Sequence, residues 1–261
     1  MLSAKLIGPL ALLVTIGPVS APMSGQSGGA ETRDVVGSAR RAYYSLNGHS
    51  FNGFHAAIEP DWKVILGPTA TPENLKVFRA LHFSVIVDAS GAAIVNHEFP
   101  TTQQNKLAPY LKQIHYDIQR LVSSFFGTWA LFMISSPFPE SQIKIDSAGN
   151  EYRLLYNVQS AEVVLAMSRE FVIREMRVTD PKSKRTINPV FRKTAEGFVL
   201  SGYHTVFEPV GEGSRSTTDI TVAYRDVGGL KLPNKIHITG VYDGEPIEAA
   251  LRFNQHVLRR N

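Results

Sequence analysis

Cysteine is absent from the 261 residues of this chain, and neither sign of charge dominates it. Without cysteine there is no disulfide, no thiolate metal ligand and no lipid-modified N-terminal cysteine. The formal net charge is +4, from 27 Lys and Arg against 23 Asp and Glu. This small excess is not the strongly basic surface that nucleic-acid binding requires. We therefore expect no nucleic-acid partner, and a fold that depends on its hydrophobic core alone.

The chain after residue 30 also lacks the short motifs of common catalytic and cofactor sites. It has no Gly-x-Ser-x-Gly elbow, no glycine-rich phosphate loop and no pair of histidines four residues apart around a glutamate. Ser201 and His204 are three residues apart on a predicted strand, so they face opposite sides and cannot act as nucleophile and base. We predict no enzyme activity, no metal and no cofactor. An exported hydrolase with a dispersed site, such as two distant carboxylates, is a further alternative.

The N-terminus has the layout of a secretory signal. Lys5 precedes an apolar run over residues 6–19, and the small residues Ser20 and Ala21 follow. The run has about 14 residues, fewer than the roughly 20 of a membrane-spanning helix. Cleavage after Ala21 and cleavage after Ala30 are both open. We expect residues 1–30 to be a signal and flexible N-terminus, and the mature chain to be periplasmic or secreted without an integral membrane span.

Hydrophobic spacing predicts helices in the first half of the chain. Residues 32–46 carry apolar side chains at steps of three and four, and residues 71–79 have Pro72 at the first helical position. A longer helix is expected over residues 101–134, where the polar face disappears after Ser124. A strand over residues 51–58 and a hairpin between residues 81 and 97 separate these helices.

From Ser141 onward the apolar period changes to two, which predicts strands. Turn-forming pairs such as Asp180–Pro181 and Asp243–Gly244 separate these strands, and strands joined so tightly run antiparallel. The later strands are expected over residues 162–167, 171–178, 185–192, 198–207, 219–225, 235–242 and 247–254. We predict a single α+β domain over residues 31–261: a large curved antiparallel sheet, a half-barrel of about 9–11 strands, with helices on its concave face.

Five large apolar side chains gather at the end of the long predicted helix: Leu121, Phe125, Trp129, Phe132 and Met133. Aromatic and methionine side chains suit a cavity that accepts apolar ligands of varied shape. We therefore predict that these five side chains bind ligand in a lipid-sized cavity. The alternative interpretation is an ordinary core helix packed against the sheet.

A basic cluster lies near the Asp180–Pro181 turn: Lys182, Lys184, Arg185, Arg192 and Lys193. One interpretation is contact with anionic lipid head groups. The other is the solvated tip of a hairpin, which the turn-forming pair in the same place favours.

The whole pattern resembles the bacterial periplasmic lipoprotein-carrier superfamily, whose members carry acyl chains or lipids, or sense envelope stress. The resemblance rests on the signal, the helix 32–46, the strand 51–58, the helices between early strands and Gly229-Leu230-Lys231-Leu232-Pro233 before the closing strands. It implies an unclosed barrel of about eleven antiparallel strands around helices and a hydrophobic cavity. The helix 101–134 is long for this family, and no residue here matches its cavity arginine, so lipoprotein release is not carried over.

These observations together predict an exported binding or carrier protein for a lipid or acylated protein, held in an apolar cavity. The alternative is an envelope protein-interaction or sensor domain, in which an envelope protein is the partner and the cavity is filled by the protein's own side chains. The ligand-binding residues of the first hypothesis are core residues in the second.

Overall fold

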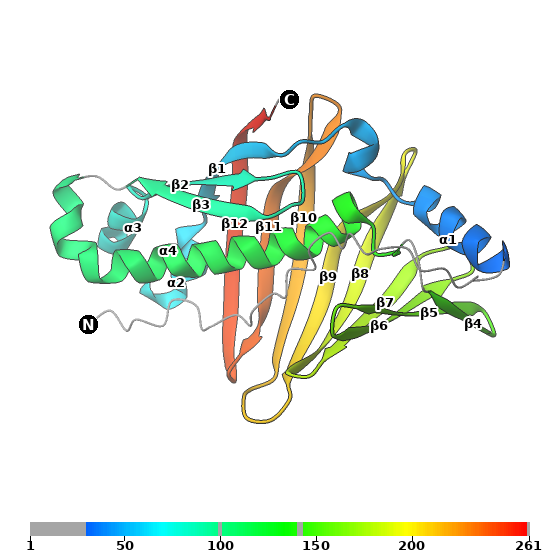
Figure 1. Cartoon of the computed structure of the whole chain (residues 1–261). Coiled ribbons are helices and arrows are strands. Elements are labelled where there is room, and N and C mark those ends of the chain that lie inside the picture. Colours follow the sequence, from blue (N-terminus) through cyan, green and yellow to red (C-terminus); the bar gives the residue numbers. More distant parts are fainter. Residues whose placement is uncertain (1–29, 99–100, 140–142, 260–261) are drawn as a thin grey trace.

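Twelve antiparallel strands form one open sheet in the computed structural model (Figure 1). The structure describes residues 30–98, 101–139 and 143–259, and only the backbone of residues 30–33, 101–110 and 148. Most of the predicted signal therefore lies outside the described residues. The strand order is β3-β2-β1-β12-β11-β10-β9-β8-β7-β6-β5-β4. The strands are β1 (Phe54–Pro60), β2 (His82–Val87), β3 (Ala93–Glu98), β4 (Lys144–Ala148), β5 (Glu151–Val158), β6 (Ala161–Ser168), β7 (Ile173–Asp180), β8 (Ser183–Thr194), β9 (Gly197–Pro209), β10 (Ser216–Val227), β11 (Leu230–Tyr242) and β12 (Glu245–Leu258).

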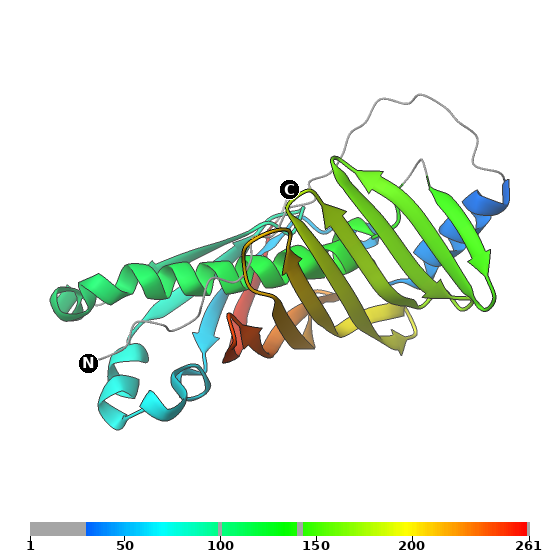
Figure 2. The ribbon, with the colours of Figure 1, turned by 90° about the horizontal axis from the view of Figure 1, so that it is seen from below.

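The predicted α+β class, with a curved and unclosed antiparallel sheet, is confirmed. The sheet has twelve strands where nine to eleven were expected. Figure 2 shows the sheet curving around its helices, which lie on the concave side. The helical segments are α1 (Ala30–Ala42), η1 (Leu46–His49), α2 (Trp62–Leu66), η2 (Gly67–Thr69), α3 (Pro72–Phe78), α4 (Thr101–Ala130) and the π-helix η3 (Leu131–Ser135).

The topology explains the length of α4. β3 and β4 follow one another in sequence but lie at opposite edges of the sheet. The chain must therefore cross the whole sheet between them, and α4 makes the first part of this crossing along the concave face, from β3 to β10, with η3 reaching β8 (Figures 1 and 2). Its 30 residues rise about 45 Å: the helix first runs along β3, which Gln119 contacts, and then reaches β10, where Trp129 contacts Tyr224.

The first helix ends earlier than its hydrophobic spacing predicts. α1 stops at Ala42, where residues 32–46 were expected to be helical, because the next residues bind the sheet. The Tyr44 amide donates to the Phe198 carbonyl at 3.1 Å, and Tyr43 forms a bridge with Phe198. Gly197 permits this close approach, because a Cβ there would lie 2.8 Å from the Ala42 carbonyl oxygen. Tertiary hydrogen bonds here replace the last helical turn.

The other early elements are close to expectation, with one addition. β1 begins at Phe54 where a strand was predicted from residue 51, and the Thr71 hydroxyl caps α3 by accepting from the Asn74 amide at 3.2 Å. The short helix α2 was not predicted. Asp61 caps it by accepting from the Lys63 amide at 3.1 Å, which is the side-chain signal of a helix start.

The end of α4 is fixed against the turn between β2 and β3. The Asp88 carboxylate holds this turn by accepting from the Ser90 and Ala92 amides at 2.8 and 3.0 Å. Gly91 adopts a φ of +87°, and a Cβ at this residue would lie 2.2 Å from the Ala130 Cβ. The glycine is therefore required both by its backbone conformation and by the helix packed on it.

Candidate functional site

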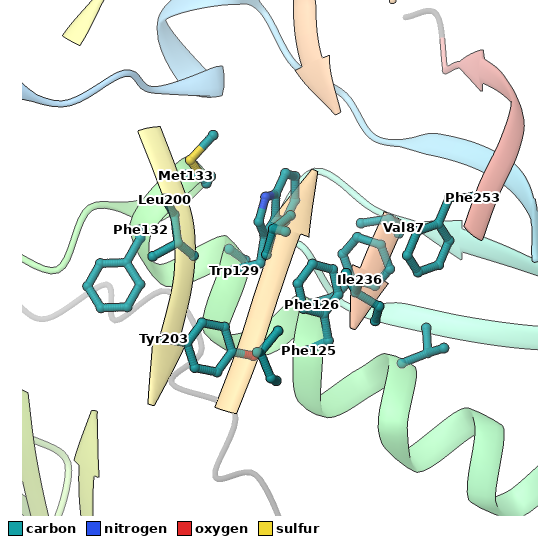
Figure 3. Packing of buried hydrophobic residues seen from close by; sticks show 14 of the residues in the cluster. Val87, Phe125, Phe126, Trp129, Phe132, Met133, Leu200, Tyr203, Ile236 and Phe253 are labelled. Carbon is teal, nitrogen blue, oxygen red and sulfur yellow. The ribbon is translucent and has the colours of Figure 1, made fainter. Parts of the chain in front are cut away.

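The five side chains predicted to bind an apolar ligand all lie in the core between the helix and the concave face of the sheet. Their exposed fractions are 2% for Leu121, 0% for Phe125 and Trp129, 2% for Phe132 and 1% for Met133. The structure thus brings all five into one core, where other parts of the protein cover each of them. Figure 3 shows Phe125, Trp129, Phe132 and Met133 of this set.

Aromatic rings from the sheet fill the space around these side chains. Phe125 stacks on Phe253 of β12 with ring centroids 6.3 Å apart, and Phe126 packs edge-on against both Phe253 and Trp129. At the other end Phe132 packs edge-on against Phe191 of β8, at 5.7 Å. Side chains of the protein therefore occupy the place in which the sequence predicted a ligand.

Three side chains with polar atoms, those of Trp129, Tyr203 and Tyr224, lie inside this apolar region. The Trp129 indole N–H donates to the Tyr224 hydroxyl at 3.2 Å. The Tyr203 hydroxyl is buried beside the Thr128 side chain of α4. Burial raises the pKa of both tyrosines far above the usual value, so the two hydroxyls are neutral. They can bind a ligand only as neutral hydrogen-bonding groups.

The basic cluster near residue 182 is divided between two environments. Lys182, Lys184, Arg192 and Lys193 are exposed, as a solvated hairpin requires. Arg185 is half-buried instead, with its guanidinium carbon 5.9 Å from the centroid of the Phe207 ring, and burial lowers its pKa. The cluster therefore does not form one continuous cationic surface.

The outer face of β5–β8 carries an open, charged hollow of about 300 Å³ that the sequence analysis missed. Val164 and Ala166 are among its lining residues, and around them lie three arginines, two glutamates and an asparagine: Arg153, Arg174, Arg177, Glu151, Glu175 and Asn188. Four of these charged side chains form two ion pairs: Arg174 with Glu151 at 3.2 Å, and Arg177 with Glu175 at 2.7 Å. The hollow thus holds one more cation than anion.

The register explains how these charges meet. Arg153 of β5 pairs with Ala166 of β6, and Ala166 pairs with Glu175 of β7. All three residues lie on the face of the sheet opposite the core, because strand side chains alternate between faces. The sequence shows charged residues at alternating positions of these strands. Only the pairing of the strands shows that their side chains meet in one hollow.

Within the described part of the chain no three His, Asp or Glu side chains are grouped so that they could hold a metal ion. Among the same residues, no helix combines the length and the apolar character needed to cross a membrane.

The fold and its interior define a class: an α+β protein with an unclosed antiparallel half-barrel, filled on its concave side by its own long helix. Comparison of the chain with protein-family models, curated proteins and solved structures gives no match. The open antiparallel sheet agrees with the half-barrel architecture that the lipoprotein-carrier resemblance implies. Because no comparison gives a match, membership of that superfamily stays a prediction.

Proposed function

We propose that this protein is an exported interaction domain of the cell envelope, with a self-filled half-barrel that presents its outer face to an acidic partner. The observation that carries the proposal is the burial of the predicted ligand-binding side chains, none of which is more than 2% exposed. The secretory layout of residues 1–30 supports export.

The free energy of opening the interior favours this function over that of a lipid carrier. Among the described side chains of α4, eight large apolar ones are buried: Leu111, Ile114, Ile118, Leu121, Val122, Phe125, Phe126 and Trp129. At about 1.5–3 kcal/mol each, their exposure costs roughly 12–24 kcal/mol. A sixteen-carbon acyl chain gains about 0.8 kcal/mol per methylene, or roughly 12 kcal/mol. One acyl chain therefore offsets displacement of the helix only at the lowest of these costs.

The charged hollow on β5–β8 is the surface that we assign to the partner. Among the lining residues Arg174 and Arg177 each have a carboxylate beside them, and Arg153, which lies opposite Asp146 of β4, forms no ion pair with a described residue. The paired arginine side chains remain 64% and 60% exposed, so a partner can reach them. Guanidinium groups bind carboxylates through paired hydrogen bonds. An acidic segment of a protein fits this arrangement.

Titration with a fluorescent decaglutamate peptide at low ionic strength tests the proposal. We expect saturable binding that added salt weakens and that Arg153→Glu reduces about tenfold. Lys193→Glu is the matched control, because it makes the same charge change at an exposed residue outside the hollow. Equal binding by the wild type and Arg153→Glu would show that the hollow is not the site.

A lipid carrier is the second candidate, and the buried Tyr203 hydroxyl favours it. This hydroxyl has the Thr128 side chain beside it but no well-formed hydrogen bond to a described residue, and a ligand carbonyl could accept its proton. Native mass spectrometry of the mature protein, purified from its own compartment, separates the two functions. A lipid that co-purifies supports the carrier, and a protein that is empty and ignores added fatty acid supports the interaction domain.

A further inference from the structure

Two histidines from different elements meet on the surface, away from the charged hollow. The Nδ1 atoms of His97 on β3 and His115 on α4 are 2.9 Å apart. Their ring centroids are 4.4 Å apart with an angle of 55° between the planes, so the rings meet at an angle rather than head to head. His97 is exposed and His115 is half-exposed, so solvent and solutes reach the pair.

The two rings are held in place by a repeating contact between the helix and the strand. His115, Gln119 and Ser123 are four residues apart on α4, and they face His97, Val95 and Ala93 on β3. The Gln119 side chain accepts from the Val95 amide at 2.6 Å and donates to the Ala93 carbonyl at 3.0 Å. Ser123 donates to the same carbonyl at 3.1 Å. Four helical residues rise about 6.0 Å and two strand residues about 6.7 Å, so the contacts stay matched.

We propose that His97 and His115 form a two-histidine site for a divalent transition-metal ion, Cu²⁺ above all, which links α4 to the edge strand β3. Imidazole nitrogens bind such ions at about 2.0–2.1 Å. Two nitrogens in adjacent corners of a square-planar site then lie about 2.9 Å apart, whereas a tetrahedral ion needs about 3.3 Å. The observed separation fits the square-planar geometry that Cu²⁺ and Ni²⁺ prefer. Water fills the remaining positions on the exposed side.

The metal takes the place of the proton between the rings. Without metal, one neutral imidazole donates an Nδ1 proton to the lone pair of the other. In the metal-bound form both Nδ1 lone pairs point to the ion, and each ring carries its proton on Nε2. No group is oxidised or reduced and no net proton is released. The order of divalent-ion affinities places Cu²⁺ first at such a nitrogen site.

Titration of the untagged mature protein with Cu²⁺, followed by calorimetry and electron paramagnetic resonance, tests this proposal. We expect one equivalent of Cu²⁺ with two coordinating nitrogens. Each of His97→Gln and His115→Gln should weaken binding by about tenfold or more, because the second ligand acts at a high effective concentration. His55→Gln, which changes an exposed histidine on β1, is the matched control and should bind as the wild type does.

A second measurement separates loss of the site from loss of the fold. Thermal unfolding without metal should give similar midpoints for the wild type and all three variants. Added Cu²⁺ should raise the midpoint of the wild type and of His55→Gln, because an ion that binds only the folded state stabilises it. The two site variants should show no such rise. Equal Cu²⁺ affinity in the wild type and His115→Gln, or binding through a single nitrogen, would overturn the proposal.

Discussion

At the scale of the residue, Trp129 connects the apolar and the polar parts of the interior. Its ring is fully buried against Phe126, and its N–H donates to the Tyr224 hydroxyl. This burial fits the core interpretation that the sequence also allowed, and contact with a ligand stays a prediction. The two roles differ in what a truncation does to stability, and so they can be separated.

We expect Trp129→Ala to lower the free energy of unfolding by about 3–5 kcal/mol, because it removes a buried aromatic ring and leaves a cavity. Tyr224→Phe, which removes only the hydroxyl that Trp129 contacts, should cost about 1 kcal/mol. Urea denaturation measures both. A Trp129→Ala protein as stable as the wild type would place this side chain in a binding site instead of the core.

Asp117 on α4 is a buried carboxyl, 3% exposed, with a pKa raised by burial from 3.8 to about 6. Gln113, which donates to it at 2.8 Å, and Arg120 oppose the shift. Because the folded protein binds this proton more tightly than the unfolded chain, stability falls as the pH rises from about 4 to about 6. Above pH 6 the full penalty is present.

Asp117→Asn should therefore be more stable than the wild type above pH 6, by about 1–3 kcal/mol. The difference should shrink through the window between pH 6 and pH 4 and disappear below it. Denaturant unfolding at pH 4, 5, 6 and 8 measures the effect. A gain that is the same at every pH would show that the charge of Asp117 is not its cause.

At the scale of the element, the contact between α4 and β3 protects one edge of the sheet. An edge strand presents free amide and carbonyl groups that can pair with another chain. Here the Gln119 amide takes the place of a neighbouring strand by bonding both Val95 and Ala93. The helix therefore seals this edge with side chains instead of backbone.

Gln119→Ala should lower the free energy of unfolding by about 1–3 kcal/mol, because the Val95 amide loses this partner and the Ala93 carbonyl keeps only Ser123. It should also increase aggregation, as an uncovered edge does. Lys112→Ala, an exposed change on the same helix, is the control and should be nearly neutral. Denaturant unfolding and light scattering measure the two effects, and equal behaviour of both variants would contradict this role of Gln119.

The contact between the turn at Gly91 and Ala130 of α4 gives a second test of how the helix packs on the sheet. Gly91→Ala should cost about 2–4 kcal/mol, because the new Cβ meets Ala130 and the backbone is left-handed. Gly244→Ala has a similar φ, +78°, but no atom within 4 Å of the new Cβ, so it should cost only about 1 kcal/mol. Thermal unfolding compares the two variants. A smaller loss for Gly91→Ala than for Gly244→Ala would contradict the close packing.

At the scale of the whole molecule, α4 runs from the β3 edge to the middle of the sheet and fills this part of the half-barrel. The helix and the concave face share one continuous core, which runs from β1 to β8 through the aromatic side chains. An apolar ligand therefore competes with the protein's own side chains for the same space. This competition has a direct consequence for stability in the presence of lipid.

Palmitate added to the mature protein should leave the midpoint of thermal unfolding unchanged. A ligand at a hundred times its Kd stabilises the folded state by about 2.7 kcal/mol, which calorimetry detects easily. The control is the same titration after Phe125→Ala, which opens space beside Phe253. Stabilisation of the wild type by palmitate would show that the interior accepts a chain, and would favour the carrier.

Much of the fold could be predicted because its signals are local. The change of apolar period at Ser141 and the tight turns after it indicate an antiparallel sheet, and the steps of three and four indicate the long helix. The early end of α1 could not be predicted, because the Tyr44 amide bonds to Phe198, far away in sequence. The charged hollow was missed for the same reason, since Arg153 and Glu175 meet only through strand pairing.

The sequence by itself determined the antiparallel class, the order of the elements and which side chains are apolar enough for burial. These properties depend on residues within a few positions of one another. The tertiary structure alone decided that β3 and β4 lie at opposite edges, and hence that the chain between them, with α4 as its first part, crosses the concave face. A large apolar side chain is equally suited to a core and to a ligand cavity. Whether Trp129 faces one or the other depends on which distant strands cover it.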